Sequence, residues 1–399
     1  MPWKNTSIIG QRWQLVKALL RAEHSVSDWC RSFGISRKTA YKWLRRFTAG
    51  GRRDLSDHSR RPHRVPLQMR RKWIERIART RRHHRHWGPK KIQTCLLRQY
   101  GQAPATATIA RWLQRLQLTL RRRRRPRKAC WLKVPPLTTA TAPNQVWTAD
   151  FKGWFRSGNG QRVEPLTVRD LFSRYVLGIR LLPDQRWQPA KTVFTKLFKG
   201  YGLPQVIRTD NGGPFASTGP AGLSRLSAWW TALGIRVEFI RPGHPEENGA
   251  HEQMHRILKA ETTRPPAQTR QGQQHRTTGW VKSYNHLRPH EALDQEVPNV
   301  RYRKSAEPMP PYRRPLQYPA RWPQRQVRSN GEIKWRGRRR FIGEAFVRHR
   351  IGLKPLGAEV QAVYFGSLLI GHLHDHDPGA MRPAVYQRRT TTPPAKAKV

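Results

Sequence analysis

Apolar residues recur every three or four positions between residues 10 and 48, and this spacing predicts three helices. The three apolar faces consist of Leu15, Val16, Leu19 and Leu20, then Val26, Trp29, Cys30 and Phe33, and finally Tyr41, Leu44 and Phe47. We expect Gly34 to end the second helix and Ser36 to cap the third. A short helix, a glycine-containing turn and a basic helix are typical of a helix-turn-helix.

The third of these helices is expected to carry the side chains that contact DNA. They are Arg37, Lys38, Thr39, Lys42 and Arg45. The alternative is a three-helix packing module whose basic face touches only phosphates. Residues 61–120 repeat the pattern more loosely, with helices near 68–80, from Pro89 to Gly101, and over 106–116. They predict a second helix-turn-helix-like module.

From residue 144 the pattern changes to short alternating runs separated by helical ones. The predicted order is strands at 145–155, 163–168 and 174–182, a helix at 190–201, a strand at 205–209, a helix at 223–233, a strand at 236–240 and a helix at 247–261. Three hairpin-like strands followed by alternating helices and strands predict an α/β sheet of mixed direction. This is the ribonuclease-H-like order.

The remainder of the chain predicts a linker, a small β-barrel and a tail. Proline and arginine dominate 298–327, and short strand candidates with glycine turns follow at 332–335, 340–342, 344–347, 359–365 and 367–373. The expected organisation is a helix-turn-helix at 1–60, a second such module at 61–120, a basic linker at 121–143, an α/β core at 144–297, a linker at 298–327, a small β-barrel at 328–380 and a disordered tail at 381–399.

The net charge of the chain predicts the kind of partner it binds. Lys and Arg number 78 and Asp and Glu 24, which gives a formal net charge of +54. Such a field favours a polyanion, and nucleic acid is the commonest one. A basic run in the 121–143 linker is expected to follow phosphates. It consists of Arg121, Arg122, Arg123, Arg124 and Arg125. The alternative is a ribosome-like or nonspecifically adhesive basic protein.

Other compositional features predict where the chain works. The sequence shows neither a signal peptide nor an apolar run of about 18 residues, so we expect a cytoplasmic, nucleoid-associated protein without a membrane partner. Cys30, Cys95 and Cys130 are widely spaced and contain no CxxC pair, which argues for reduced thiols and against a cysteine-based zinc finger.

Three carboxylates stand out because acids are scarce. Only five acids precede Asp150, whereas 13 of the 24 lie between Asp150 and Glu296. Asp150 falls within a predicted strand, Asp210 follows another, and Glu252 lies in the first turns of a predicted helix. A buried carboxylate costs several kcal/mol unless a cation or hydrogen bonds compensate it. Together these side chains predict a site for two Mg²⁺ or Mn²⁺ ions beside a nucleic-acid phosphate.

Longer segments around these carboxylates resemble the DDE transposases of bacterial insertion sequences, which share the catalytic fold of retroviral integrases. The segments, within residues 147–296, read WTADFKGWF, LTVRDLFSRYVLG, RTDNGGPFAS, RPGHPEENGAHEQMHRILK and YNHLRPHEAL. Asp150, Asp210 and Glu252 match the metal-binding triad of that family. The active-site loops match at Asn211 and Gly212, and at His244, Asn248 and Gly249.

The resemblance implies an enzyme that binds the ends of a mobile element, cleaves a strand there and joins the freed 3′-hydroxyl to target DNA. It also implies action as a homo-oligomer on DNA, without a nucleotide cofactor. Glu246 and Glu247 compete with Glu252 for the third metal-binding role. A catalytically silent DNA-binding regulator, or a nuclease that cuts without joining, are the alternative functions.

Overall fold

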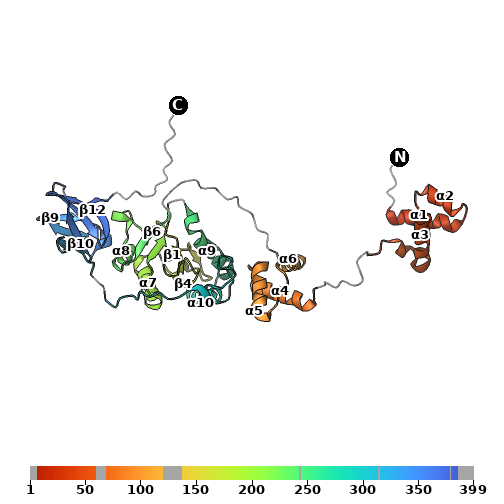
Figure 1. Ribbon diagram of the computed structural model, residues 1–399, viewed down its shortest axis with the longest axis horizontal. Coiled ribbons are helices and arrows are strands. Elements are labelled where there is room, and N and C mark those ends of the chain that lie inside the picture. The colour runs from red at the N-terminus through yellow and green to blue at the C-terminus, as the bar shows by residue number, and fades with distance from the viewer. Residues whose placement is uncertain are drawn as a thin grey trace, which may run out of the picture. The chain divides into compact units, whose positions relative to one another are not determined.

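The computed structural model describes residues 7–59, 69–119, 137–241, 244–312, 315–377 and 379–384, and it divides into two units, Met1–Arg70 and Arg71–Val399 (Figure 1). The first unit contains helices α1 (Ile8–Arg21), α2 (Val26–Ser32) and α3 (Arg37–Gly50). Leu15, Val16, Trp43 and Leu55 form its buried centre. The predicted cap is present, since the Ser36 side chain accepts a hydrogen bond from the backbone N–H of Thr39.

The second unit begins with three more helices, α4 (Arg71–His83), α5 (Pro89–Tyr100) and α6 (Thr106–Arg115). Their boundaries follow the local signals, because Pro89 occupies the first turn of α5 and Gly101 ends it in the left-handed conformation. The buried Arg81 guanidinium donates to the carbonyl oxygens of Trp87 and Leu118, which ties α4 to the segment before α5 and to the segment after α6. The helical part of the fold prediction is confirmed.

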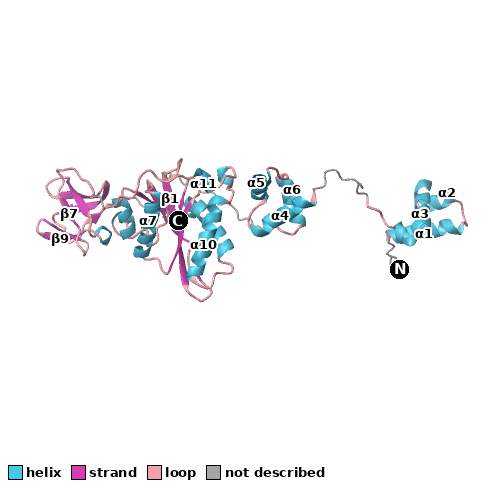
Figure 2. Cartoon of the chain, turned by 90° about the horizontal axis from the view of Figure 1, so that it is seen from below, coloured by secondary structure: helices cyan, strands magenta, loops and turns pink. Residues whose placement is uncertain are grey.

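A mixed sheet forms the core (Figure 2). Its strands are β1 (Val146–Phe151), β2 (Phe155–Arg156), β3 (Arg162–Asp170), β4 (Val176–Leu182), β5 (Val206–Thr209) and β6 (Arg236–Phe239). The order is β2-β3-β1-β5-β6, with β4 also paired to β3. β1 runs antiparallel to β3 and parallel to β5, and β5 runs parallel to β6. The sheet of mixed direction is as predicted.

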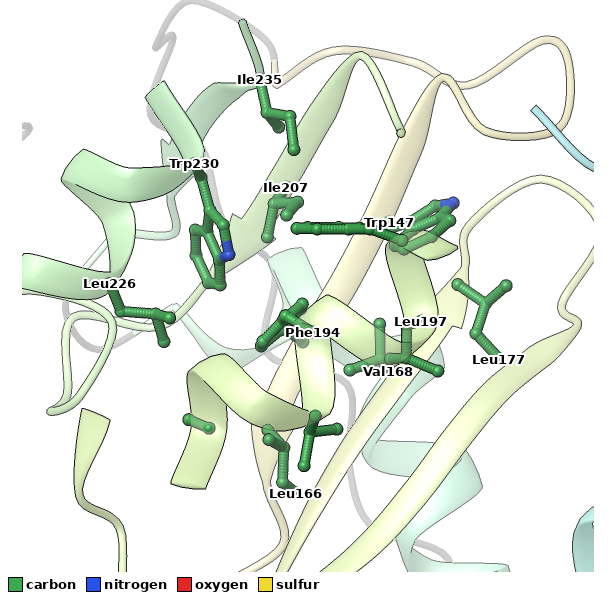
Figure 3. Packing of buried hydrophobic residues seen from close by; sticks show 14 of the residues in the cluster. Trp147, Leu166, Val168, Leu177, Phe194, Leu197, Ile207, Leu226, Trp230 and Ile235 are labelled. Atoms are coloured by element: carbon green, nitrogen blue, oxygen red, sulfur yellow. The ribbon is translucent and has the colours of Figure 1, made fainter. Parts of the chain in front are cut away.

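One face of the sheet is apolar and is covered by α7 (Trp187–Tyr201) and α8 (Arg225–Ala232). Trp147 and Ile207 from the strands pack there with Phe194 and Trp230 from the helices (Figure 3). Because side chains alternate along a strand, the residues between the apolar ones point to the opposite face. That opposite face therefore receives Thr148 and Asp150.

The opposite face is covered by α9 (Gly249–Thr262) and α10 (Arg270–His286), with a short α11 (Pro298–Arg301) further along the chain. Helix α10 is missing from the sequence prediction because polar side chains form much of its buried face. Asn285, for example, accepts from the backbone N–H of Val176 and donates to the carbonyl of the same residue, at 2.9 and 3.0 Å. An apolar periodicity does not reveal such a helix.

The C-terminal region contains β7 (Gln324–Gln326), β8 (Glu332–Trp335), β9 (Arg338–Phe341), β10 (Arg350–Pro355), β11 (Val360–Phe365), β12 (Leu368–His374) and β13 (Arg382–Pro383). Five of these strands form an antiparallel sheet in the order β13-β12-β11-β10-β7, and β8 and β9 form a separate hairpin. The buried apolar cluster of this C-terminal region includes Phe346, Ile351 and Phe365. Leu223 and Ala228 of the core also belong to this cluster.

The predicted β-barrel is wrong. Closure requires the two outer strands to pair with each other. Within the residues described, β7 and β13 do not pair, and with three and two residues they offer little backbone for a ladder. The segment 344–347, predicted as a strand, is a 3₁₀ turn at Glu344–Phe346.

Across the described ranges, no helix combines the length and apolarity needed to span a bilayer.

Candidate active site

Asp150 and Asp210 lie at the same edge of the sheet. Thr148 of β1 pairs with Arg208 of β5 in parallel register. Asp150 therefore occupies the end of β1, and Asp210 directly follows the end of β5. The carboxyl ends of neighbouring parallel strands are where open α/β sheets bind their ligands.

Glu252 approaches this edge from helix α9. It lies in the first turn and is exposed, whereas His251, Met254, His255 and Leu258 form the buried face of the helix. The buried guanidinium of Arg169 on β3 donates to the carbonyl oxygen of Ala250 at 2.7 Å. This contact fixes the start of α9 against the sheet, two residues before Glu252.

The start of α9 lacks a side-chain cap. Asn248 is the residue before Gly249, and its side chain makes no capping hydrogen bond. Asn248 is buried, at the end of the 3₁₀ turn Pro245–Asn248. This 3₁₀ turn runs directly into α9, so the backbone before the helix is already helical rather than extended as it is before a capped helix.

The carboxyl group of Asp150 is affected by both of the other carboxylates. Burial, followed by the charges of Asp210 and Glu252, raises the pKa of Asp150 to about 7 against a lowering hydrogen bond from the Phe151 backbone. Burial also raises the pKa of Asp210, and the Gly212 N–H, 3.2 Å from Asp210 Oδ1, opposes this rise. Mutually repelling carboxylate oxygens are the donor set that Mg²⁺ and Mn²⁺ prefer, so the residues fit such an ion.

Two histidines behind Asp150 were not predicted. The Thr167 hydroxyl donates to the Asp150 carbonyl oxygen at 2.9 Å, and it lies 2.6 Å from His251 Nε2 and 2.7 Å from His255 Nε2. Thr148 Oγ1 lies 2.8 Å from His251 Nδ1. Burial lowers the pKa of both rings, that of His255 to about 3, so both are neutral. We refer to Thr148, Thr167, His251 and His255 as the histidine network.

The hydrogen-bond directions in this network leave both Nδ1 atoms without a proton, and that of His251 accepts from Thr148. Because the Thr167 hydroxyl proton is used on the Asp150 carbonyl, both histidines must donate to Thr167 through Nε2–H. His255 Nδ1 is then bare, 3.6 Å from Asp150 Oδ2. Asp150, His251 and His255 could geometrically share an ion, but both His251 nitrogens are already hydrogen-bonded. The spacing of four residues between the histidines, one helical turn, is the signal that could have identified them.

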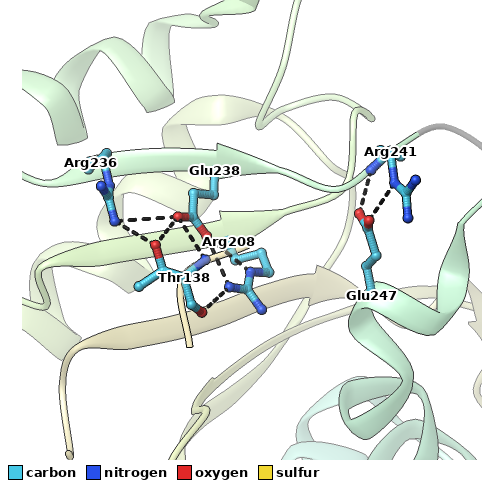
Figure 4. Close-up of polar contacts among 6 residues, drawn as sticks. All are labelled: Thr138, Arg208, Arg236, Glu238, Arg241 and Glu247. Carbon is cyan, nitrogen blue, oxygen red and sulfur yellow. Dashed lines mark hydrogen bonds and ion pairs between the residues drawn. The ribbon is translucent and has the colours of Figure 1, made fainter. Parts of the chain in front are cut away.

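Glu247, the competing glutamate, is engaged elsewhere. Its carboxylate accepts from the Arg241 backbone N–H at 2.8 Å and from Arg241 Nε at 2.5 Å, and both side chains are about nine-tenths buried (Figure 4). This pair closes the chain segment that leads into α9. The engagement of Glu247 favours Glu252 as the third carboxylate, and the side chain of Glu246 lies outside the described part of the structure.

Strand β5 is fixed by a second polar cluster (Figure 4). Arg208 donates to Glu238 on β6, with its closer contact at 3.0 Å, and to the Thr138 carbonyl oxygen at 2.6 Å. Beyond the strand, Asn211 Nδ2 donates to the Ile240 carbonyl oxygen at 2.6 Å. These contacts hold the turn that carries Asp210. Of the other loop residues, Gly249 opens α9 and the half-buried His244 lies before the 3₁₀ turn.

The predicted DNA-contacting residues divide into two groups. Arg37, Lys38, Lys42 and Arg45 are exposed on α3, and Thr39 is half-buried. The run Arg121 to Arg125 lies outside the described residues. Since α3 belongs to the first unit, its residues and the carboxylates are described separately.

Family models match most of this organisation. A model described as integrase core domain matches residues 140–245, and a second with the same description matches 233–298. A helix-turn-helix domain matches residues 11–63, and a homeodomain-like domain matches 39–113. The C-terminal domain of IS481 family transposases matches residues 324–375.

Similar proteins come from bacterial insertion elements. The chain is 27% identical over 225 residues to an uncharacterized 31.7 kDa protein of insertion element IS407 from Burkholderia multivorans, covering 56% of this chain and 78% of that protein. It is 28% identical over 255 residues to an uncharacterized 39.2 kDa protein of insertion element IS476 from Xanthomonas euvesicatoria, covering 63% and 69%. Among solved structures, the HTLV-2 integrase catalytic core domain in complex with magnesium aligns with 16% identity and a TM-score of 0.34, over 41% of this chain and 100% of that one.

Proposed function

We propose that this chain, an insertion-sequence transposase with a retroviral-integrase-like core, uses Asp150, Asp210 and Glu252 to cleave a strand at element ends and join it to target DNA. The observation that carries the assignment is geometric: the parallel register of β1 and β5 brings Asp150 and Asp210 to the same end of the sheet, and Glu252 lies in the first turn of α9, which packs on that sheet. The raised pKa of Asp150, to which the two other carboxylates contribute, supports it. Groups that repel one another at the end of a sheet are suited to a cation.

The three carboxylates would hold Mg²⁺ or Mn²⁺, with two ions proposed from the number of oxygens available. When bound, the ions supply charge neutralisation at the phosphate and lower the pKa of an attacking water or hydroxyl. The protein itself holds the carboxylates in position. The histidine network holds the Asp150 backbone, Arg169 holds the start of α9, and Arg208 holds β5 beside Asp210. Exchange of one phosphodiester for another needs no nucleotide cofactor.

DNA binding belongs to the helical modules, and we propose that α3 engages the element ends through its exposed basic side chains. Joining two ends to one target requires two active sites, so we also propose a homo-oligomer on DNA.

A strand-transfer assay tests the proposal. Labelled element ends and a target duplex would be incubated with the protein in Mg²⁺ or in EDTA. Joined products that depend on the metal are expected. Cleavage without joined products would favour a nuclease, and binding without chemistry in Mg²⁺ or Mn²⁺ would favour a silent regulator.

Metal affinity should increase with pH through about 7. Without metal, Asp150 has its pKa raised to about 7, so below that pH the carboxyl is protonated and must release the proton to bind a cation. We expect the affinity for Mn²⁺ to fall about tenfold per pH unit below 7 for each proton released. Calorimetry in two buffers of different ionisation enthalpy at pH 6, 7 and 8 measures that release. Asp150→Asn should remove it, and pH-independent binding by the unmodified protein would contradict the prediction.

Lys42→Ala combined with Arg45→Ala should weaken binding to element ends and reduce its salt dependence. Each lost phosphate contact lowers the slope of log K against log salt by about 0.9. Fluorescence anisotropy over a salt series provides the measurement. Arg31→Ala is a matched control, because Arg31 is exposed on α2 and pairs with Asp28 at 2.8 Å. Equal slopes for the double variant and the unmodified protein would exclude these side chains from phosphate contact.

A further inference from the structure

Trp154 is an exposed tryptophan beside the candidate active site. It lies in the segment between β1 and β2, four residues after Asp150, and 55% of its surface is exposed. Among the tryptophans in the described ranges, it is the only one that is exposed rather than buried or half-buried. Tryptophan is usually well buried, so an indole left open to solvent beside a catalytic edge requires a reason.

Two arginines accompany the indole ring. The guanidinium carbons of Arg162 and Arg156 lie 5.2 and 5.8 Å from its centroid. Both guanidiniums are held by hydrogen bonds within the hairpin. Arg162 donates to the fully buried Glu164 carboxylate at 2.6 and 2.8 Å, and Arg156 donates to the Gly160 carbonyl oxygen at 2.9 Å. We refer to Trp154, Arg156 and Arg162 as the tryptophan platform; its cations are oriented before any ligand arrives.

A small pocket opens next to the platform. It has a volume of about 100 Å³, and Trp154 and Phe155 line it together with Leu258 of α9. This is several times the roughly 10–15 Å³ that one water needs by the same measure. Lys152 and Lys259 also line it, so apolar and cationic residues are combined at this pocket.

The pocket adjoins the catalytic carboxylates. Lys152 is two residues from Asp150, and Lys259 is on α9, two helical turns after Glu252. Lys152 directly follows β1, which carries Asp150, and Lys259 lies on the same helix as Glu252. The two elements that carry these carboxylates therefore also lead to the lining of the pocket. A nucleotide adjacent to a phosphate at the carboxylates would reach the tryptophan platform.

We propose that the tryptophan platform stacks an unpaired nucleobase of the DNA substrate next to the phosphate at which the carboxylates act. This inference rests on the proposed function and adds a base-binding subsite to it. An aromatic face accepts any base, and a base stacked on an aromatic side chain contributes about 1–3 kcal/mol. The guanidiniums and the two lysines match the flanking phosphates. A base within the duplex cannot stack there, so the nucleotide is one that has left its pair.

The proposal can be tested by binding measurements alone, in which removal of a base from the DNA is combined with substitution of Trp154 in the protein. Binding would be measured in EDTA to element ends that carry two unpaired terminal nucleotides, each with its base present or replaced by an abasic residue. For the unmodified protein, removing the base at one of these positions should weaken binding by about 5- to 150-fold, which corresponds to 1–3 kcal/mol. For Trp154→Ala, removing the same base should change binding less than twofold.

Two variants complete the test. Trp154→Phe should restore most of the base dependence, because a phenyl ring also stacks. Tyr312→Ala, at an exposed aromatic residue outside the pocket, should behave like the unmodified protein. Equal losses on base removal in the unmodified protein and in Trp154→Ala, at both unpaired positions, would overturn the inference. Failure of the proposed function has a separate signature, because it appears as missing joined products in Mg²⁺ from the unmodified protein.

Discussion

Asp210→Asn should reduce strand cleavage and joining by on the order of a thousandfold or more, while affinity for element ends stays within about twofold. Asparagine preserves the shape of the side chain and an acceptor for the Gly212 N–H. It removes the negative charge that a divalent cation needs. Single-turnover assays in Mg²⁺ measure the chemistry, and anisotropy in EDTA measures the binding.

The same substitution at an unrelated aspartate provides a control. Asp294 is exposed and adopts a left-handed conformation that asparagine also tolerates. Asp294→Asn should leave cleavage, joining and stability unchanged. If Asp210→Asn lost end binding and thermal stability together with activity, the aspartate would have a structural role and the proposed metal site would be wrong.

Glu247→Ala should lower the free energy of unfolding by about 3–5 kcal/mol, because it leaves the buried Arg241 guanidinium without its partner. The Arg241 backbone N–H also loses its acceptor. Urea denaturation followed by circular dichroism measures the loss. Glu247→Gln retains acceptor oxygen without the charge and should fall between the alanine variant and the unmodified protein.

Comparison with Glu252→Gln separates the two glutamates. Glu252 is exposed, and replacing it should abolish chemistry with little change in the free energy of unfolding. Normal stability together with lost chemistry in Glu247→Ala would contradict the structural role of Glu247 and reopen the choice of the third carboxylate.

The arrangement of the carboxylates could be predicted because it depends on local periodicity. Alternation in β1 places Trp147 and Ala149 in the apolar cluster and Asp150 on the other face. The apolar Val206 and Ile207 identify the strand that Asp210 follows. Both signals are contained in a few consecutive residues.

The histidine network could not be predicted in the same way. The contact of Thr148 with His251 joins residues 103 positions apart, and that of Thr167 with His255 joins residues 88 apart. Only the packing of α9 on the sheet brings them together. The β-barrel prediction failed for a related reason, because strand candidates do not reveal which edges pair, and β10 was not recognised at all.

The contacts of α9 also determine how it can move. Apolar side chains tolerate sliding, but the hydrogen bonds from Arg169 to Ala250 and from His251 and His255 to Thr167 each require one particular partner atom. Displacement of the helix by one turn would break all three and leave buried polar groups unpaired. These hydrogen bonds therefore hold helix α9 against the sheet at one position along the helix axis. Any adjustment of this half of the site to an incoming duplex has to be a movement of helix and sheet as one block.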